Sequence, residues 1–183
     1  MNKLLLITGD LAAGKSTFSQ ILSKRYQVSV FNKDTIKEVL GNTIGFSDRQ
    51  ENLRLSNAAV EMMRFIFSQT AAFHNNLILE ANFHTGELEK LHQIADENGY
   101  EILTLVLRGE LSVLHERYLN RIQNENRHFV HLSNELDVFE NFRNYIDVSR
   151  KENVGGNVIY IDASGFSYQK DEELLMKIDT FMG

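Results

Sequence analysis

The fold of this sequence is decided by one stretch, Gly9-Asp10-Leu11-Ala12-Ala13-Gly14-Lys15-Ser16. It fits the pattern G-x-x-x-x-G-K-[ST] of a phosphate-binding loop, in which glycines let several backbone N–H groups point at one anion. An apolar run of strand length, 3–8, precedes the loop, and an amphipathic helical pattern, 15–25, follows it. The start of that helix adds a partial positive charge. The motif therefore predicts a nucleotide phosphate site.

The residues of this loop have separate expected roles. Lys15 would reach the β- and γ-phosphates of ATP, and the hydroxyl of Ser16 would ligate Mg²⁺. The alternative is a glycine-rich turn with a chance lysine, which average residue usage produces in roughly one chain of this length in a hundred or fewer. ATP and Mg²⁺ are thus the predicted cofactors. The residues expected to bind them are Gly9, Asp10, Leu11, Ala12, Ala13, Gly14, Lys15, Ser16 and Thr17.

Length and composition fit one globular domain over 1–183. The chain has a formal net charge of −6, which counts against non-specific binding to nucleic acid, and no cysteine, which excludes disulfides and thiolate chemistry. The apolar start of the sequence is too short for a signal peptide and is interpreted as a first strand. No run is long enough to span a bilayer. We therefore expect a cytoplasmic protein without membrane association, whose oligomeric state the sequence does not indicate.

Candidate strands and helices alternate along the chain. The strands are expected at 3–8, 27–31, 76–81, 101–107 and 157–162, and the helices at 15–25, 34–41, 49–74, 85–98, 111–125, 135–150 and 169–181. Alternation of this kind predicts an α/β fold with a doubly wound, five-stranded parallel sheet. A helical insertion, 41–75, and a polar lid region, 117–134, would lie at the carboxyl ends of the strands, where ligands bind in such folds.

Asp34 follows the second predicted strand. A carboxylate at that position lies across the crevice from the phosphate-binding loop, where it can accept a proton from a substrate hydroxyl that attacks the γ-phosphate. The other interpretation is an N-cap for the helix that begins there, and the two roles are compatible.

Glu80 lies near the end of the third predicted strand. An acid at this place often holds Mg²⁺ in proteins with a phosphate-binding loop, directly or through water. Its length leaves two functional roles open, a place in the metal shell or hydrogen bonds to substrate hydroxyls, and a plain surface acid is the alternative. Asn82 and His84 follow on the same loop and are weaker candidates for lining the crevice.

Three arginines lie in or after the fifth predicted helix: Arg117, Arg121 and Arg127. Arg117 and Arg121 are four residues apart and share one helical face. Guanidinium groups stabilise the charge that spreads over a moving phosphoryl group, so all three are candidate catalytic residues on a closing lid. A solvated helix face with ordinary ion pairs is the alternative. His128 and His131 have the spacing of a metal pair, but lack a clear third ligand, so we favour a nucleotide contact or a structural hydrogen bond over zinc.

Two further regions give weaker signals. Arg54, like Arg49, lies on the insertion and could hold an anionic substrate, although a charged helix face explains either residue alone. Asp162-Ala163-Ser164-Gly165 ends the fifth strand, where the loop can pack near a nucleobase through backbone groups. We count Asp34, Glu80, Asn82 and Arg54 as the candidate substrate-binding residues, and Ser16 and Glu80 as the candidate metal ligands.

Most of the chain resembles the small P-loop kinases, especially those of the zeta-toxin and chloramphenicol phosphotransferase type and their AAA-labelled relatives. The resemblance rests on the loop Gly9–Ser16, on Lys33-Asp34-Thr35-Ile36, on Leu77–Phe83, on Arg117-x-x-x-Arg121 and on Arg127-His128. It implies that Asp34 is the general base and that the arginines belong to the lid. Relatives commonly have proline after the Arg-His pair, where this sequence has Phe129.

The sequence as a whole therefore predicts an ATP- and Mg²⁺-dependent kinase that transfers the γ-phosphate to a hydroxyl of a small molecule. Two alternatives stay open: a nucleotide-binding regulatory or toxin-type ATPase, and a kinase of polynucleotide 5′ ends. The acidic charge counts against the second, and no basic aromatic patch supports it. The sequence does not name the phosphate acceptor, because acceptor pockets are built from scattered side chains.

Overall fold

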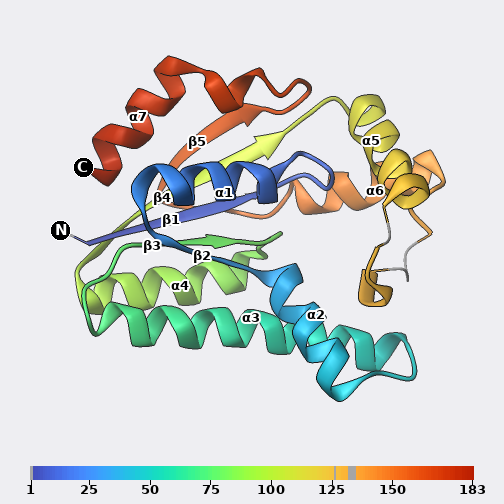
Figure 1. Ribbon diagram of the computed structural model, residues 1–183, viewed down its shortest axis with the longest axis horizontal. Coiled ribbons are helices and arrows are strands. Elements are labelled where there is room, and N and C mark those ends of the chain that lie inside the picture. Colours follow the sequence, from blue (N-terminus) through green and yellow to red (C-terminus); the bar gives the residue numbers. More distant parts are fainter. Residues whose placement is uncertain (1, 126, 132–134) are drawn as a thin grey trace.

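The computed structural model describes residues 2–125, 127–131 and 135–183 (Figure 1). The strands are β1 (Asn2–Gly9), β2 (Ser29–Asn32), β3 (Leu77–Glu80), β4 (Tyr100–Arg108) and β5 (Asn157–Asp162). The α-helices are α1 (Lys15–Tyr26), α2 (Lys33–Ile44), α3 (Arg49–Ala71), α4 (Thr85–Asn98), α5 (Leu111–Asn124), α6 (Phe139–Ser149) and α7 (Glu172–Met182). Two short 3-10 helices are η1 (Phe129–His131) and η2 (Ser167–Lys170).

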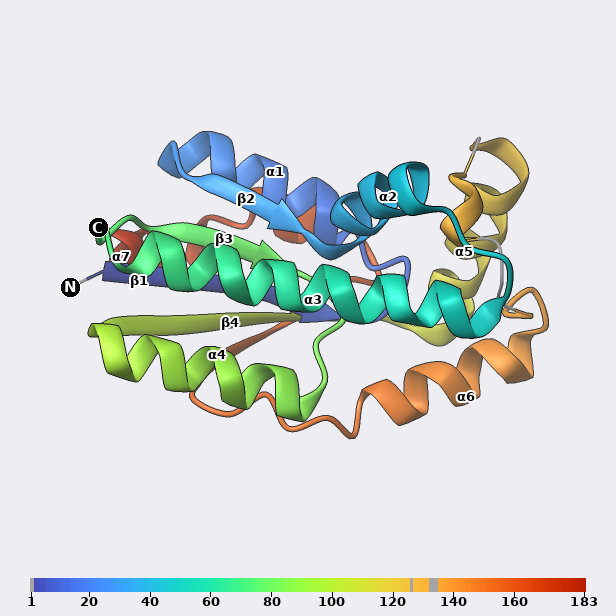
Figure 2. The ribbon, with the colours of Figure 1, turned by 90° about the horizontal axis from the view of Figure 1, so that it is seen from below.

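The five strands form one parallel sheet in the order β2-β3-β1-β4-β5, which confirms the predicted fold class. Helices α1 and α7 lie on one side of this sheet, and α3 and α4 lie on the other (Figures 1 and 2). Parallel neighbours need a crossover connection, so each strand is followed by at least one helix. Among the described residues, no helix is both long and apolar enough to cross a membrane.

Alternation along β1 divides the core between the two faces of the sheet. Leu5 and Ile7 belong to the cluster under α1 and α7, whereas Leu4 and Leu6 belong to the cluster under α3 and α4. All four side chains are fully buried. A strand covered on both faces is apolar throughout, which is why the sequence before the phosphate-binding loop is an unbroken apolar run.

Several element boundaries differ from those that the sequence predicts. The helix expected over 135–150 begins only at Phe139, because Val138 is extended. The last predicted helix, 169–181, divides at Asp171, which has an extended backbone and caps α7 by accepting hydrogen bonds from Glu173 N and Leu174 N. These differences lie at helix starts, where one extended residue decides the boundary.

The segment 41–75 is only partly an addition at the carboxyl ends of the strands. Helix α2 and the first turns of α3 lie at that end, beyond the tips of β1 and β3 (Figure 2). The later part of α3 runs back along the sheet, where Met63, Phe67 and Ala71 are buried in the core. The second half of α3 is therefore part of the structural frame that supports the site.

Gly9, the first residue of the phosphate-binding loop, is held against β4. Its φ is +119°, and a Cβ placed on it would lie 2.1 Å from the carbonyl oxygen of Leu107. The next residue, Asp10, donates its N–H to that same carbonyl at 2.8 Å. Only glycine lets the backbone pass so close to β4 in this conformation.

Gly9→Ala is expected to lower the free energy of unfolding by at least about 2 kcal/mol, because the new methyl group meets backbone atoms that cannot move aside. Chemical denaturation monitored by circular dichroism measures this loss. Gly165→Ala is the matched control, since its nearest neighbour lies 3.8 Å away, and it should stay within about 0.5 kcal/mol of the wild type. Equal stability of the two variants would contradict the close approach.

Candidate active site

The loop between β1 and α1 forms a cradle of backbone N–H groups. Two of its residues have left-handed backbones, Ala12 with φ 62° and Gly14 with φ 85°. Changes of hand within a short loop turn successive N–H groups toward one side, which is the geometry that binds anions. Within the described part of the chain, the N–H groups of Leu11, Lys15 and Ser16 donate to no backbone carbonyl. The donor set fits the phosphates of a nucleotide.

Lys15 is buried at the start of α1. Its Nζ donates hydrogen bonds to the carbonyl oxygens of Gly9 at 3.1 Å and Asp10 at 2.7 Å, so the ammonium lies over the loop. Burial lowers the pKa of Lys15 below its usual value, and the negative charges of Glu80, Asp34 and Asp10 partly offset this effect. The ammonium is therefore held among carboxylates at the place where the motif puts the phosphates.

Ser16, at the amino end of α1, meets Asn32 and Glu80, which lie at the carboxyl ends of β2 and β3. The Ser16 hydroxyl donates to Glu80 Oε2 at 3.0 Å, and Asn32 Nδ2 donates to both Ser16 Oγ, at 3.2 Å, and Glu80 Oε2. The sheet register places Asn32 of β2 beside Glu80 of β3. A hydroxyl and a carboxylate are hard oxygen ligands of the kind that Mg²⁺ prefers. The two predicted metal ligands are thus in contact.

Glu80 is 4% exposed, which is unusual for a carboxylate. Burial raises its pKa, while the charge of Lys15 acts in the opposite direction; the charge of Asp34 raises it further. A buried acid beside a buried lysine at the end of a phosphate-binding loop is typical of a functional site.

Asp34 lies in the first turn of α2 and is exposed. Its negative charge raises the pKa of both Lys15 and Glu80, so it lies near these two groups. The predicted N-cap role is wrong, because Asn32 caps α2 by accepting a hydrogen bond from Thr35 N at 2.9 Å.

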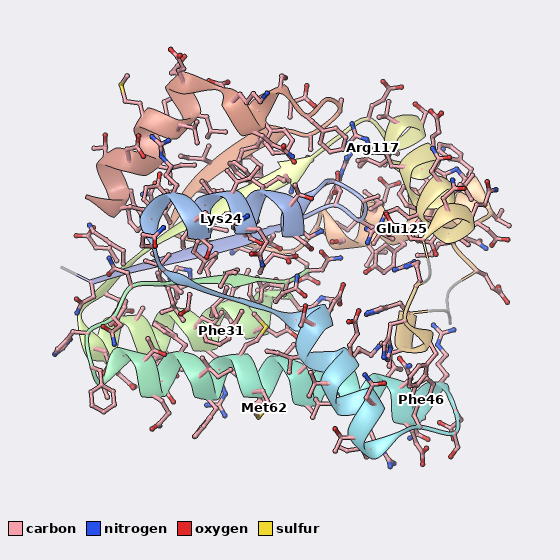
Figure 3. The ribbon with its side chains drawn as sticks, in the orientation of Figure 1. Lys24, Phe31, Phe46, Met62, Arg117 and Glu125 are labelled. Carbon is pink, nitrogen blue, oxygen red and sulfur yellow. The ribbon has the colours of Figure 1, made fainter. Side chains whose placement is uncertain are left out.

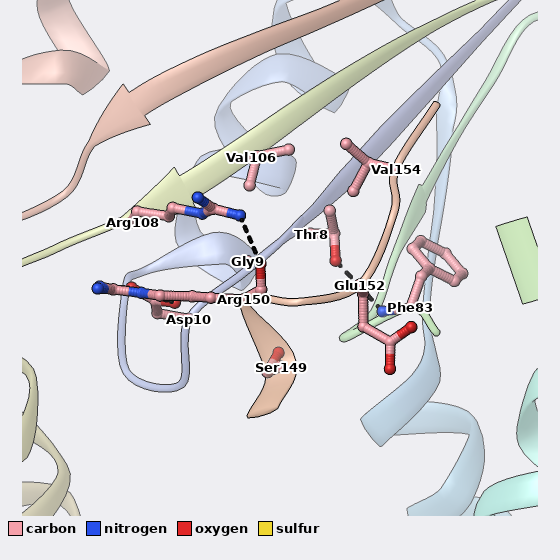
Figure 4. Close-up of a pocket in the computed structure, with 10 residues that line it drawn as sticks. All are labelled: Thr8, Gly9, Asp10, Phe83, Val106, Arg108, Ser149, Arg150, Glu152 and Val154. Carbon is pink, nitrogen blue, oxygen red and sulfur yellow. Dashed lines mark hydrogen bonds and ion pairs between the residues drawn. The ribbon is translucent and has the colours of Figure 1, made fainter. Parts of the chain in front are cut away.

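Asp10 forms an ion pair with Arg150, a residue that the sequence analysis does not single out. Its carboxylate is 1% exposed and accepts hydrogen bonds from Arg150 Nη2 at 2.6 Å, from Arg150 Nε at 3.1 Å and from Gly109 N at 3.0 Å. Arg150 follows α6, and its carbonyl oxygen accepts a hydrogen bond from Arg108 (Figure 4). The side chain of Asp10 thus anchors the loop, and only its backbone remains for a nucleotide.

A small cavity of about 20 Å³ lies behind this anchor, between the ends of β1 and β4 and the segment after α6 (Figure 4). Its lining includes Arg108, Arg150 and Glu152. Lys15, Ser16, Asp34 and Glu80 do not line it. The cavity is therefore separate from the cluster of predicted catalytic residues.

Arg117 supports the loop after β5. Its guanidinium donates to the carbonyl oxygens of Ala163 and Ser164, both at 2.6 Å, and lies 4.1 Å from the ring centroid of Phe166. Figure 3 shows Arg117 on α5, on the side of this loop. The same segment contacts the phosphate-binding loop, because Tyr168 donates its hydroxyl to the Ala13 carbonyl at 3.0 Å.

The other two predicted catalytic arginines are Arg121 and Arg127. Arg121 makes an ion pair with Glu125 at 3.2 Å, and its charge lowers the pKa of both Lys15 and Glu80, so it lies near both. Arg127 lies over the ring of Tyr118, 5.7 Å from its centroid. Residues 126 and 132–134 of the predicted lid, 117–134, lie outside the described residues.

The remaining predicted residues are less tightly connected to the loop. Asn82 donates a long hydrogen bond of 3.5 Å to the hydroxyl of Tyr145 on α6. Arg54 is exposed on α3, and in the described ranges no ion pair joins it to the site. His128 and His131 make structural hydrogen bonds, to Asn42 Oδ1 at 3.0 Å and to Glu38 Oε1 at 2.9 Å.

Sequence reasoning missed Asn32 and Arg150. The role of Asn32 as a cap could have been predicted, since asparagine is a favoured residue at the start of a helix. The role of Arg150 could not, because it contacts Asp10 across 140 positions of sequence.

Arg150→Ala is expected to destabilise the protein by about 2–3 kcal/mol, because it leaves the buried carboxylate of Asp10 without its charged partner. The double variant Asp10→Asn/Arg150→Ala should recover part of that loss, since a neutral amide can still accept from Gly109 N. Urea denaturation of the two variants and the wild type measures both values. If the double variant is no more stable than Arg150→Ala, the ion pair does not anchor the loop.

Glu80 should make stability depend on pH. Because its pKa is raised in the folded protein, the stabilisation by the bound proton is fully present below the ordinary glutamate pKa, about 4.3. This stabilisation is lost as the pH rises through the raised value. The free energy of unfolding of the wild type, relative to Glu80→Gln, should therefore fall between pH 4.5 and 7.5 in metal-free buffer. A constant difference over that range would contradict the burial of an acid at this position.

Solved structures with the same fold include several kinases. A protein from Chloroflexus aurantiacus described as a putative kinase has a TM-score of 0.82 at 24% identity, with 98% of each chain covered. Shikimate kinase from Bacteroides thetaiotaomicron has a TM-score of 0.64 at 15% identity, with 98% of each chain covered. The tunicamycin resistance protein of Deinococcus radiodurans has a TM-score of 0.62 at 20% identity, covering 97% of this chain and 96% of its own. These similarities establish the fold of a P-loop kinase.

No curated protein matches the sequence significantly. The family model described as an AAA domain matches residues 4–143, which include the phosphate-binding loop, α2, β3 and the lid arginines. The match spans well over half of the chain, so this protein belongs to the AAA domain family and has the P-loop kinase fold.

Proposed function

We propose that the protein transfers the γ-phosphate of ATP to a hydroxyl group of a small molecule. The observation that carries this proposal is the meeting of four groups at one point: the buried ammonium of Lys15, the Ser16–Glu80 contact and the facing carboxylate of Asp34. A nucleotide switch needs the first three. A free carboxylate facing them is what a kinase adds for its acceptor.

In this proposal the chain binds the nucleotide through its loop and the segment after β5. The N–H groups of the loop and the ammonium of Lys15 hold the phosphates, and the backbone held by Arg117 lies near the base. Ser16 and Glu80 would hold Mg²⁺, which when bound neutralises charge on the phosphates. Asn32 fixes the Glu80 carboxylate, so its orientation is set before any ligand arrives.

Asp34 accepts the proton of the acceptor hydroxyl as its oxygen bonds to the γ-phosphorus and the bond to the β-phosphate oxygen breaks. The products are ADP and a phosphate ester. Arg121 and Arg127 add positive charge beside the moving group, where guanidinium groups stabilise the transition state. Asn82, Tyr145 and Arg54 are the side chains we propose for acceptor contacts, because they lie on the elements around the crevice.

The experiment is a coupled ADP-release assay with ATP, Mg²⁺ and a panel of alcohols. The panel includes gluconate and shikimate, because proteins of this fold are described as a gluconokinase and a shikimate kinase. Lys15→Met should lower the rate by at least about 100-fold, through lost charge stabilisation. Asp34→Asn should lower kcat by about 10²–10⁴-fold while ATP binding is retained.

Two exposed residues give matched controls: Lys24→Met and Asp96→Asn should keep the wild-type rate. Lys24 lies on α1 away from the loop (Figure 3). ATP hydrolysis without transfer to any alcohol would favour the regulatory ATPase instead. Transfer to a polynucleotide 5′ end, added as one arm of the panel, would favour the other alternative. Unchanged transfer by Asp34→Asn would remove the general-base role.

A further inference from the structure

We propose that Lys37 and Gly41 on α2 form a clasp that holds the segment His128–His131 and so fixes the position of Arg127, a candidate catalytic residue. The proposal rests on the proposed function, because positioning matters only if phosphate is transferred there. Lys37 and Gly41 are positioning residues in this scheme, since neither contacts the reacting atoms.

The clasp is built around the carbonyl group of Val130. Lys37 Nζ donates to the Val130 carbonyl oxygen at 3.2 Å and to Asn52 Oδ1 at 2.6 Å, and Asn52 Nδ2 donates to the same carbonyl at 3.1 Å. Lys37 and Asn52 are 7% and 3% exposed. One backbone oxygen of the lid is thus bound by two buried side chains, one from α2 and one from α3.

The buried ammonium of Lys37 is costly, which argues for a specific role. Burial lowers its pKa, and within the described ranges no carboxylate forms an ion pair with it. A leucine or methionine would fill the same space without that cost if packing were the only requirement. An ammonium supplies what those residues lack, a strong donor that fixes the position of a loop carbonyl.

The side chain of Val130 fits a notch that exists because residue 41 is glycine. Val130 is 1% exposed, and a Cβ added to Gly41 would lie 2.4 Å from its Cγ1. A β-branched side chain has little rotamer freedom, so it cannot turn away from the new methyl group. Any side chain at position 41 must therefore displace the segment.

Contacts on either side complete the clasp. His131 pairs with Glu38, His128 with Asn42, and Phe129 stacks on Phe46 with ring centroids 5.4 Å apart. Figure 3 shows Phe46 on the connection between α2 and α3, below η1. Each residue from His128 to His131 is thus held by a contact with α2, α3 or the connection between them.

The contacting residues lie along one stripe of α2. Successive residues of this stripe are spaced three or four apart along α2 and so share a helical face. The residues are Asp34, then Lys37 and Glu38, then Gly41 and Asn42. The proposed general base is thus one turn from the first contact of the lid. Arg127 directly precedes the clasped segment, and its guanidinium lies over the ring of Tyr118 on α5. The seat on α2 therefore fixes the backbone from which this guanidinium extends.

Gly41→Ala is the sharpest test, because it blocks the seat of Val130 without removing a hydrogen-bonding group and favours the helix. Gly86→Ala is its control, since Gly86 also lies in a helix and has no neighbour within 4 Å. Hydrogen exchange of the peptide 127–131 should be at least about tenfold faster in Gly41→Ala than in Gly86→Ala. Lys37→Met should loosen the same peptide through the lost hydrogen bonds.

Transfer from ATP to the alcohol selected in the acceptor panel is the second measurement. Gly41→Ala should lower kcat on the order of 100-fold with little change in the KM for ATP, because the reacting groups are misplaced while the loop is intact. The proposal is overturned if exchange in Gly41→Ala matches the control. It is equally overturned if exchange is faster but kcat is unchanged. Failure of the wild type to phosphorylate any alcohol refutes the proposed function, whereas the exchange result still decides the clasp.

Discussion

The structure depends on the burial of charge at the end of β1. A lysine ammonium, a glutamate carboxylate and an aspartate carboxylate are removed from water there, and each is held by a different part of the chain. Lys15 binds loop carbonyls, Glu80 is bound by Ser16 and Asn32, and Asp10 is bound by Arg150. The helices and strands around them are arranged so that each buried charge has partners, as buried charges require.

The same requirement explains how the end of the sheet is connected to α2. Asn32 ends β2 and caps α2, so one side chain fixes both the acid on β3 and the direction of the helix that carries Asp34. Lys37 then joins α2 to the lid and to α3. Helix α2 thus carries contacts to both ends of the site: its cap is bound to the acid on β3, and its Lys37 is bound to Val130 and Asn52.

The sequence predicts well whatever depends on local pattern. The apolar runs locate all five strands, and the loop from Gly9 to Ser16 begins at the end of β1 and runs into α1, as predicted. The position of Glu80 also follows from its place at a strand end. The N-cap of α2 is harder to predict, because Asn32 and Asp34 are both residue types that cap helices. Only the place where β2 ends decides between them.

Contacts between distant segments are beyond this kind of prediction. Arg150 lies in a polar stretch that resembles any helix end, and nothing local links it to Asp10. Lys37 and Asn52 look like ordinary polar positions on amphipathic helices, yet both are buried, because the carbonyl they share comes from Val130, far along the chain. Which residues pair in such contacts depends on the whole fold, and local patterns in the sequence do not predict it.

The anchor at Asp10 has a consequence for where this domain can be divided. The family match stops at residue 143, before Arg150 and before β5. A fragment cut at that limit would contain the whole phosphate-binding motif, but would leave a buried carboxylate uncompensated and β4 with an open edge. The smallest autonomous unit therefore extends past α6 and β5, and the boundary of sequence similarity is not the boundary of cooperative folding.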